Sequence, residues 1–356
     1  MNQRIVVAMS GGVDSSVAAL LLREEGYEVI GISMKLYEGS RCCTADDVRD
    51  AKEAAALGKF PHYTANFKET FEREVVNYFV RGYLKGETPN PCVICNQEVK
   101  FKALLERANE LGVSLLATGH YARVLYEDVS GRWVLKKGRD REKDQSYFLA
   151  TLPQEVLRVL RFPLGNFTKE EVREIARRNG LRFSEKEESQ ELCFIPDEGY
   201  FPLLRERVEA TGRSPLQEGE IVNIRGEVLG KHKGIANFTI GQRRGLGISA
   251  GRPLYVIDLD PSRNRVIVGE DRDLFLRELI ARDVNWIPFD KLNGSRGVTA
   301  KIRSRHEGAL ARVESLGDHE VRVVFEEPQR AITPGQLVAF YEDDVVLGGG
   351  WIQSQM

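Results

Sequence analysis

The chain has 356 residues, of which 42% are hydrophobic and 29% charged, and its 51 Lys and Arg are set against 53 Asp and Glu. This length predicts two or three domains with a large apolar core. The net charge of −2 at pH 7 excludes a uniformly basic nucleic-acid-binding protein, so any basic surface must be local.

No apolar run reaches the length of a transmembrane helix, and the first residues follow a strand pattern rather than that of a signal peptide. The five cysteines are odd in number and show no disulfide framework. These features favour a cytoplasmic protein that does not act at a membrane and whose cysteines do chemistry or bind metal.

The amino-terminal segment predicts an anion-binding loop. Apolar residues at 5–9 indicate a buried strand, and residues 17–25 indicate a helix that ends at Gly26. The sequence S-G-G-V-D-S-S joins the two at 10–16. Its glycines let the backbone approach a ligand closely, while the serine hydroxyls and the amides at the helix start can surround phosphate oxygens.

This stretch is neither a Walker A loop nor a dinucleotide fingerprint, because it has no Lys-Ser/Thr pair and no G-x-G-x-x-G. Asp14 is unusual in a bare phosphate cradle and makes sense as a ligand of Mg²⁺ that arrives with the phosphates. An ordinary strand–helix turn with a serine cap is the alternative. The continuation into Asp14, Ser15 and Ser16 after a buried first strand favours nucleotide binding.

Strand and helix patterns alternate as far as His120. Further strands are predicted at 29–34, 60–63 and 115–120, and helices at 45–57, 67–84 and 100–111. This alternation is typical of an α/β fold with a doubly wound parallel sheet. Ligands of such sheets bind beyond the carboxyl ends of the strands, where Ser10, Met34 and Gly119 fall. We assign a catalytic domain to residues 1–205.

The remaining chain changes character twice. Residues 132–143 carry six basic and two acidic side chains, and a helix is predicted at 169–179. From about residue 216, short β-like runs separated by glycine dominate. This pattern predicts a small β-rich central domain at 206–275 and a C-terminal β-barrel domain at 276–356.

Three cysteines are candidates for chemistry: Cys92 and Cys95, a C-x-x-C pair in a loop before a helix, and Cys193. One interpretation pairs a nucleophilic thiol in this loop with a sulfur-carrying thiol at Cys193. A second makes all three cysteines ligands of a [4Fe–4S] cluster. A third interpretation makes the C-x-x-C pair and Cys42 and Cys43 the ligands of zinc. It is the weaker one, because adjacent cysteines are poor tetrahedral chelates. Cys193 can equally be a small buried hydrophobe, and Cys42 and Cys43 structural residues.

The loop at 10–16 resembles the pyrophosphatase loop of the N-type ATP pyrophosphatases, which cleave ATP between the α- and β-phosphates and leave an adenylated substrate. Eight segments share a further pattern, and in chain order they are S-G-G-V-D-S-S at 10–16, T-P-N-P-C-V-I-C-N at 88–96, A-T-G-H-Y-A-R at 117–123, K-D-Q-S-Y-F-L at 143–149, S-Q-E-L-C-F-I at 189–195, T-I-G-Q-R-R-G-L-G-I at 239–248, P-Q-R-A-I-T-P-G-Q at 328–336 and L-G-G-G-W-I at 347–352. Through these segments nearly the whole chain resembles the bacterial tRNA-specific 2-thiouridylase family.

The resemblance implies a reaction. The wobble uridine of tRNAs for Lys, Glu and Gln would be flipped into the site, and its O2 would attack the α-phosphate of ATP with Mg²⁺ present. Sulfur from a donor protein, a cysteine desulfurase or a relay protein, would arrive as a persulfide on Cys193. Cys95 matches the nucleophile of the family and would close a transient Cys95–Cys193 disulfide. A [4Fe–4S] cluster on Cys92, Cys95 and Cys193 stays open as the alternative.

The resemblance also implies binding residues. Those for the target base are Asn90, Pro91 and Cys92. Those for ATP are Ala8, Met9, Ser10, Gly11, Gly12, Val13, Asp14, Ser15, Ser16, Met34 and Gly119. Those for tRNA are His120, Lys143, Asp144, Gln145, Arg303, Ser304 and Gln336.

Ser304 departs from the family, which usually has Tyr there, so an aromatic contact to the anticodon loop is missing. Two other functions compete with thiolation. An ATP-dependent amide or C–N ligase for a small metabolite would use the same loop, but it would leave Cys95 and Cys193 without a task. An RNA-binding or zinc-held scaffold that binds ATP without turning it over would produce no AMP with cognate tRNA.

Overall fold

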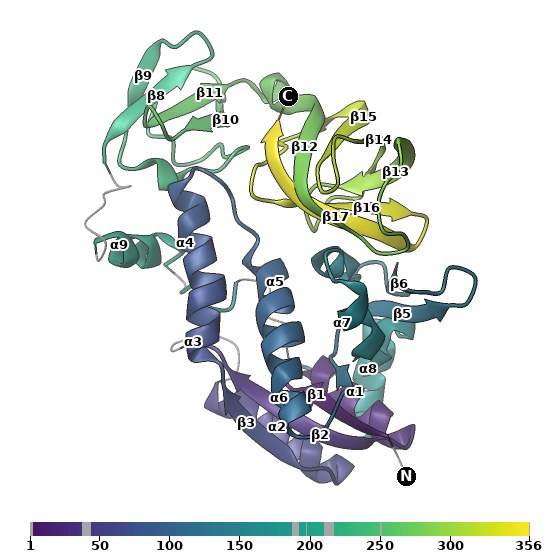
Figure 1. The fold of residues 1–356 in the computed structure, drawn as a ribbon. Helices are drawn as coiled ribbons and strands as arrows, with labels where there is room; N and C mark the ends of the chain where they lie inside the picture. The colour runs from purple at the N-terminus through teal and green to yellow at the C-terminus, as the bar shows by residue number, and fades with distance from the viewer. Residues whose placement is uncertain are drawn as a thin grey trace.

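The structure is a computed structural model that describes residues 3–37, 44–186, 192–196, 198–209, 217–249 and 251–355. Cys42 and Cys43, which we considered as structural residues or zinc ligands, lie outside the described residues. Figure 1 shows an α/β part at the amino terminus, a small β part formed by β8–β11, and a β-barrel at the carboxyl terminus.

The amino-terminal part is built on a parallel sheet in which the strand order is β3–β2–β1–β4–β7. Its strands are β1 (Arg4–Ala8), β2 (Glu28–Lys35), β3 (His62–Asn66), β4 (Leu116–Ala117) and β7 (Leu160–Arg161). This confirms the predicted doubly wound sheet. The order reverses between β1 and β4, and ligands of such sheets bind at this switch point. The loop at 10–16 follows β1 and therefore lies there.

Helices cover both faces of the sheet, as its apolar strands require. Ile5 and Val7 of β1 belong to one buried cluster, and Val6 and Ala8 belong to the other. The first face carries α1 (Val13–Glu24), α2 (Ala45–Gly58) and α8 (Lys169–Arg178). The second carries α3 (Lys68–Phe71), η1 (Glu72–Val76), α4 (Asn77–Leu84), α5 (Pro91–Ile94), η2 (Cys95–Ala103) and α6 (Leu104–Glu110).

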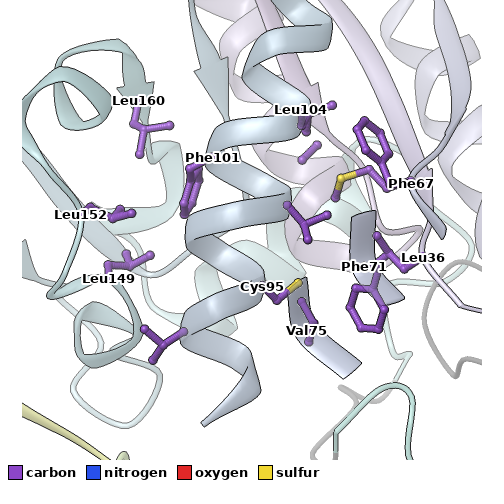
Figure 2. Close-up of a cluster of buried hydrophobic side chains, with 14 of the residues drawn as sticks. Leu36, Phe67, Phe71, Val75, Cys95, Phe101, Leu104, Leu149, Leu152 and Leu160 are labelled. Atoms are coloured by element: carbon purple, nitrogen blue, oxygen red, sulfur yellow. The ribbon is translucent and has the colours of Figure 1, made fainter. Parts of the chain in front are cut away.

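Two of these segments, η1 and η2, are π-helical and contact each other. Figure 2 shows Cys95, the first residue of η2, beside Val75 of η1 in a cluster of apolar side chains. The helix that contains Cys95 begins at Pro91, so the predicted loop around Cys92 and Cys95 is wrong. Proline at the first position of a helix is pre-organised for helical backbone angles, which explains the earlier start.

A hairpin that the sequence pattern did not predict joins the amino-terminal part to the barrel. Its strands are β5 (Ala122–Glu127) and β6 (Arg132–Lys137), and β6 pairs with β17 (Val345–Gln355) of the barrel. The side chain of Gln154 donates to the carbonyls of Trp133 and Ile287, 2.7 and 2.9 Å away. The barrel thus extends its sheet into the basic segment at 132–143 (Figure 1).

The barrel is confirmed as predicted. It runs in the order β12–β15–β14–β13–β16–β17 and closes through the β12–β17 pairing. Its remaining strands are β12 (Phe275–Trp286), β13 (Ser295–Lys301), β14 (Ala309–Ser315), β15 (Val321–Arg330) and β16 (Leu337–Glu342).

The central part is a mixed sheet in the order β10–β11–β8–β9, where β8 and β11 are parallel. Its strands are β8 (Gly219–Asn223), β9 (Val228–His232), β10 (Tyr255–Asp260) and β11 (Arg265–Gly269). The other short elements are η3 (Ser146–Leu149), α7 (Gln154–Val159), η4 (Pro163–Asn166), α9 (Phe201–Glu209), η5 (Ile235–Asn237) and η6 (Asp271–Leu274).

The expected boundary between residues 205 and 206 falls inside α9. Arg207 of α9 pairs with Glu72 of the amino-terminal part at 2.8 Å. The domain bounds 1–205, 206–275 and 276–356 stay a prediction. Within the described ranges, no helix has both the length and the apolar character needed to cross a membrane.

The core around η2 generates a stability prediction. Phe101 is fully buried there, so Phe101→Ala should lower the free energy of unfolding by about 3–5 kcal/mol through lost transfer energy and the cavity left behind. Leu310 on β14 is 59% exposed, and Leu310→Ala should change it by less than about 0.5 kcal/mol. Urea unfolding of both variants measures the difference, and similar losses would contradict this account of the core.

Candidate active site

Glycine shapes the loop at 10–16. Gly11 has a φ of 77°, and a Cβ there would lie 2.1 Å from the carbonyl oxygen of Asp47. Gly12 caps α1 without a side-chain hydrogen bond. The first amides of a helix have no partner within the helix, so the start of α1 can receive an anion. This backbone geometry is compatible with a phosphate cradle, and the binding of ATP by the loop stays a prediction.

The serine hydroxyls divide into two groups. Ser10 is exposed, and its backbone amide donates to Oγ of Ser15 at 3.1 Å. Ser15 and Ser16 are buried, and their hydroxyls donate to the carbonyl of Gly12 at 3.2 and 3.0 Å. The two buried hydroxyls hold the loop in shape. The hydroxyl of the exposed Ser10 contacts Oγ of Ser15 at 3.2 Å and accepts the amide of Gly12 at 3.4 Å.

Asp14 makes an ion pair that the sequence analysis did not predict. Nζ of Lys169, the first residue of α8, lies 2.8 Å from both carboxylate oxygens of Asp14. The hydroxyl of Tyr121 donates to Oδ1 of Asp14, also at 2.8 Å. The two ionic partners are 155 positions apart in the chain, so no local pattern relates them.

A second lysine fixes the other side of the loop. Nζ of Lys186 lies 2.7 Å from carboxylate oxygens of Asp47 and Asp50 in α2, and it donates to the carbonyl of Gly11 at 3.4 Å. Burial alone would raise the pKa of Asp47, but hydrogen bonds from Lys186 and Thr44 outweigh it and hold that pKa below its usual value. Lys186 thus connects α2 to the loop at 10–16, because it bonds two acids of α2 and the carbonyl of Gly11.

The other residues expected at ATP come from the same edge of the sheet. Gly119 follows β4, and a Cβ there would lie 2.8 Å from backbone atoms of Asp14 and Ser15. Met34 lies near the end of β2 and is 6% exposed. The structure thus brings Gly119 against the loop. Ala8, Met9 and Val13 are buried beneath it.

The three candidate cysteines differ in exposure. Cys92 is exposed, Cys95 is 8% exposed and Cys193 is half-buried, and all three are thiols in this structure. Cys95 belongs to the apolar cluster on the second face of the sheet, and Cys193 packs against that cluster. The next residue, Phe194, meets Phe71 and Phe79 edge to face, with ring centroids 5.6 and 5.2 Å apart. The two thiols expected to react therefore border the same extended apolar cluster on the second face of the sheet.

The arrangement does not offer a ready metal site. Among the residues that the structure describes, no group of three or more His, Cys, Asp or Glu side chains could hold a metal ion. Cys92, Cys95 and Cys193 as placed here thus do not fit a [4Fe–4S] cluster, which needs its thiolates gathered together. Mg²⁺ differs, because it is commonly held by one or two carboxylates together with substrate phosphates. The assignment of Asp14 to Mg²⁺ stays a prediction.

The segment expected at the target base is held by the barrel. Nε2 of Gln336 donates to the carbonyls of Thr88 and Pro89 at 2.8 and 3.4 Å, and the amide of Thr88 donates to Pro334 at 2.9 Å. Asn90, at the start of the helix, is 8% exposed. A residue expected at tRNA, Gln336, therefore also positions the segment that leads to Asn90.

Gln145 and Asp144 link the expected tRNA surface to the loop at 10–16. Oε1 of Gln145 accepts the amide of Tyr121 at 3.0 Å, and Tyr121 in turn bonds Asp14. Asp144 accepts the amides of Gly138 and Ser146 at 3.0 and 3.1 Å, which closes the turn that carries Lys143. These contacts give both residues a structural role here.

The remaining residues expected to bind tRNA differ in burial: His120 is buried, whereas Ser304 is exposed. His120 is 8% exposed, hydrogen-bonds Thr118 at 2.6 Å and packs against Phe101 and Phe162, and burial lowers its pKa well below the usual value. It is thus a neutral, buried side chain in this structure. Arg303 donates to the carbonyl of Arg330 at 3.0 Å, and Ser304 is exposed. Contacts of these residues with tRNA stay predictions.

A local cluster of cations lies where the hairpin meets the barrel. Burial lowers the pKa of Lys137 in β6 and of Lys301 in β13, and the charges of Arg141 and Lys301 lower that of Lys137 further. The charge of Asp144 offsets part of the effect at both lysines, and Asp344 does so at Lys137. Nζ of Lys137 sits 4.5 Å from the ring centroid of Tyr341. Half-buried cations whose charges repel one another favour an anionic ligand. Lys301 was not among the expected residues, because only the barrel brings it to the basic segment at 132–143.

A parallel sheet with a glycine-rich anion loop at its switch point defines a nucleotide-binding protein of the pyrophosphatase-loop class. Family models agree with this class and with the β-rich remainder of the chain. Residues 3–197 match a model described as a tRNA methyl transferase HUP domain, residues 211–270 a tRNA methyl transferase PRC-barrel domain, and residues 276–352 an aminomethyltransferase beta-barrel domain.

Full-length relatives identify the family. The chain is 49% identical to a tRNA-specific 2-thiouridylase of Caldanaerobacter subterraneus subsp. tengcongensis, over 100% of this chain and 99% of the relative. It is also 49% identical to one from Moorella thermoacetica, over 98% and 99%. The chain therefore belongs to the family of tRNA-specific 2-thiouridylases.

Among solved structures, the U34-tRNA thiolase NcsA from Methanococcus maripaludis with its [4Fe-4S] cluster is 21% identical and covers 60% of this chain and 67% of that chain. Its TM-score is 0.35, so this likeness carries no argument about the site.

The close packing at Gly119 generates a prediction about the loop. Gly119→Ala would push a methyl group into backbone atoms of Asp14 and Ser15, and overpacking of this kind costs about 1–3 kcal/mol. We expect the affinity for ATP, measured by calorimetry, to fall by about tenfold, because 1.4 kcal/mol corresponds to that factor. Gly297→Ala is the control, because its Cβ would enter open space. Equal affinities of the two variants would contradict this geometry.

Proposed function

We propose that this chain thiolates tRNA: it activates the wobble uridine with ATP and replaces its O2 by sulfur, which yields 2-thiouridine, AMP and pyrophosphate. The observation that carries the proposal is the joint presence of the anion loop at the switch point and of Cys95 and Cys193 against one apolar cluster. The full-length relatives named 2-thiouridylases support it. A ligase for a small metabolite would give neither cysteine a task.

The activation step uses the start of α1. The uridine O2 attacks the α-phosphate of ATP, and the bond between the α- and β-phosphates breaks with its electron pair going to pyrophosphate. The backbone around Gly11 and Gly12 and the positive end of α1 would hold the departing phosphates. Mg²⁺, which Asp14 would help to hold, supplies charge compensation to the phosphates when bound.

The sulfur step uses the two cysteines. The Cys95 thiolate would attack the Cys193 sulfur of a persulfide, form the Cys95–Cys193 disulfide and release hydrosulfide. Hydrosulfide would add to C2 of the adenylated uridine, and AMP would leave with the former O2. A dithiol or other two-electron reductant must then reopen the disulfide. The apolar side chains around Cys95 would keep water from the released hydrosulfide.

The partners follow from these steps. The substrate would be the tRNAs for Lys, Glu and Gln, and the sulfur would come from a cysteine desulfurase or a relay protein that reaches Cys193. Anionic phosphates of the tRNA would meet the basic segment at 132–143 and the half-buried ammonium groups of Lys137 and Lys301. Bacterial tRNA is cytoplasmic, so we place the reaction there.

The cysteine roles are tested by single-turnover thiolation of cognate tRNA with ATP and a persulfide donor. Cys95→Ser and Cys193→Ser should each lower the rate by more than about 10³-fold, because each removes an atom that reacts. Cys92→Ser changes a residue expected at the target base but no reacting atom, so it should lower the rate far less. Leu310→Ala on the surface of the barrel is the control and should retain the full rate. Activity that needs all three thiols together with bound iron, after anaerobic purification, would instead favour the cluster and contradict the relay.

The contact of Gln336 with the segment at 88–89 generates a further prediction. Gln336→Glu removes the donated hydrogen bonds while keeping the size of the side chain, so the segment that leads to Asn90 should lose its anchor. We expect KM for tRNA to rise by about 30-fold, since two lost bonds at about 1 kcal/mol each cost about 2 kcal/mol together. ATP affinity should not change, because Gln336 does not contact the loop at 10–16. An unchanged KM for tRNA, or an equal loss for ATP, would contradict this role.

A further inference from the structure

The loop at 10–16 contains an acid, Asp14, but no basic residue. The phosphates of ATP carry several negative charges. The departing pyrophosphate gains a further negative charge when its bond to the α-phosphate breaks. Helix amides supply only partial positive charges. A binding site for pyrophosphate therefore needs a cation, and the loop sequence does not supply one.

The fold brings two lysines from distant parts of the chain to this loop. Nζ of Lys186 lies between Asp47 and Asp50, two acids of α2, so its charge is compensated within that network. Nζ of Lys169 lies 2.8 Å from both oxygens of Asp14, the acid of the loop itself. The ammonium group of Lys169 thus lies beside the first turn of α1, where an anion would bind.

The position of Lys169 is fixed by its surroundings. It is the first residue of α8, which lies beside α1 (Figure 1), and Thr168 and Glu171 form a capping box at that helix start. The backbone amide of Lys169 donates to Asp140 at 2.9 Å. The side chain of Lys169 is 10% exposed and that of Asp14 is 24% exposed, so the ionic contact is shielded from water and strengthened by the lower local dielectric.

We propose that Lys169 is a pyrophosphate-binding residue, whose ammonium group bridges from Asp14 to the β- and γ-phosphates of ATP and holds the pyrophosphate as it leaves. The proposal rests on the ATP-dependent function proposed above. An ammonium group has three donors and no acceptor, so it can serve a carboxylate and a phosphate together. Lys169 then supplies, from another helix, the positive charge that a Walker A loop carries in its own sequence.

The experiment measures equilibrium binding of pyrophosphate, ATP and AMP by calorimetry, in EDTA so that no metal ion contributes. Lys169→Met keeps the length of the side chain and removes its charge. We expect pyrophosphate and ATP to bind about 10- to 100-fold more weakly, which is the usual effect of losing a charge-assisted hydrogen bond. AMP, which lacks the β- and γ-phosphates, should bind as in the wild type and also reports that the site is folded.

Two further variants separate a phosphate contact from a merely structural ion pair. Lys169→Arg keeps the cation and should retain pyrophosphate affinity within about threefold. Asp14→Asn breaks the same pair from the other side, but it leaves the Lys169 ammonium in place, so metal-free affinity for pyrophosphate should be retained or increased. If Lys169→Met does not fold, the metal-free pyrophosphate affinity of Asp14→Asn still tests whether the ammonium group of Lys169 binds the phosphates.

Unchanged pyrophosphate affinity in Lys169→Met would overturn the proposal. So would an equal loss in Asp14→Asn, because the pair would then act only by holding the loop. A wild-type protein that binds neither ATP nor pyrophosphate would overturn the proposed function itself, which keeps the two failures apart.

Discussion

The start of α1 is the point on which the rest of this structure depends. Backbone from β1, from α2 and from the end of β4 approaches it so closely that Gly11 and Gly119 leave no room for a Cβ. Such tight contact fixes the amides of the first helical turn, and these amides make an anion site only if they stay in place. Two lysines then hold the same loop: Lys169 through its ion pair with Asp14, and Lys186 through a hydrogen bond to the carbonyl of Gly11.

From this point, hydrogen bonds lead outward to the surface expected to meet tRNA. Tyr121 bonds Asp14 at one end and Gln145 at the other, while Asp140 accepts the amide of Lys169 and caps the turn that carries Lys143. The hairpin β5–β6 continues into the barrel, so the barrel and the nucleotide loop are parts of one connected framework. Hydrogen bonds through Tyr121 therefore connect Gln145, on the surface expected to meet tRNA, with Asp14 of the loop.

The two thiols proposed for sulfur transfer, Cys95 and Cys193, border the apolar cluster on the second face of the sheet. Cys95 begins a π-helical segment that packs against the π-helical η1, and Phe194 beside Cys193 is held by Phe71 and Phe79. π segments persist only where packing compensates for their poorer geometry, and they often occur at functional sites. An apolar surrounding for both thiols suits a persulfide, whose terminal sulfur would otherwise be lost to solvent.

The sequence by itself determined the parallel sheet, the loop at 10–16, the barrel and the family, because these depend on local patterns: apolar strands, glycines before a helix, and motifs in a fixed order. The sequence did not predict the helix start at Pro91, because a loop stiffened by proline and a helix that begins with proline look alike locally. It did not predict the hairpin at 122–137 either, because β6 pairs with the distant strand β17. Only the tertiary structure decided that Lys169 meets Asp14, that His120 is buried and that Lys301 joins Lys137. Each of these contacts joins elements that the fold, and not the chain order, places side by side, and charge or burial at such a contact has no signature in either segment alone.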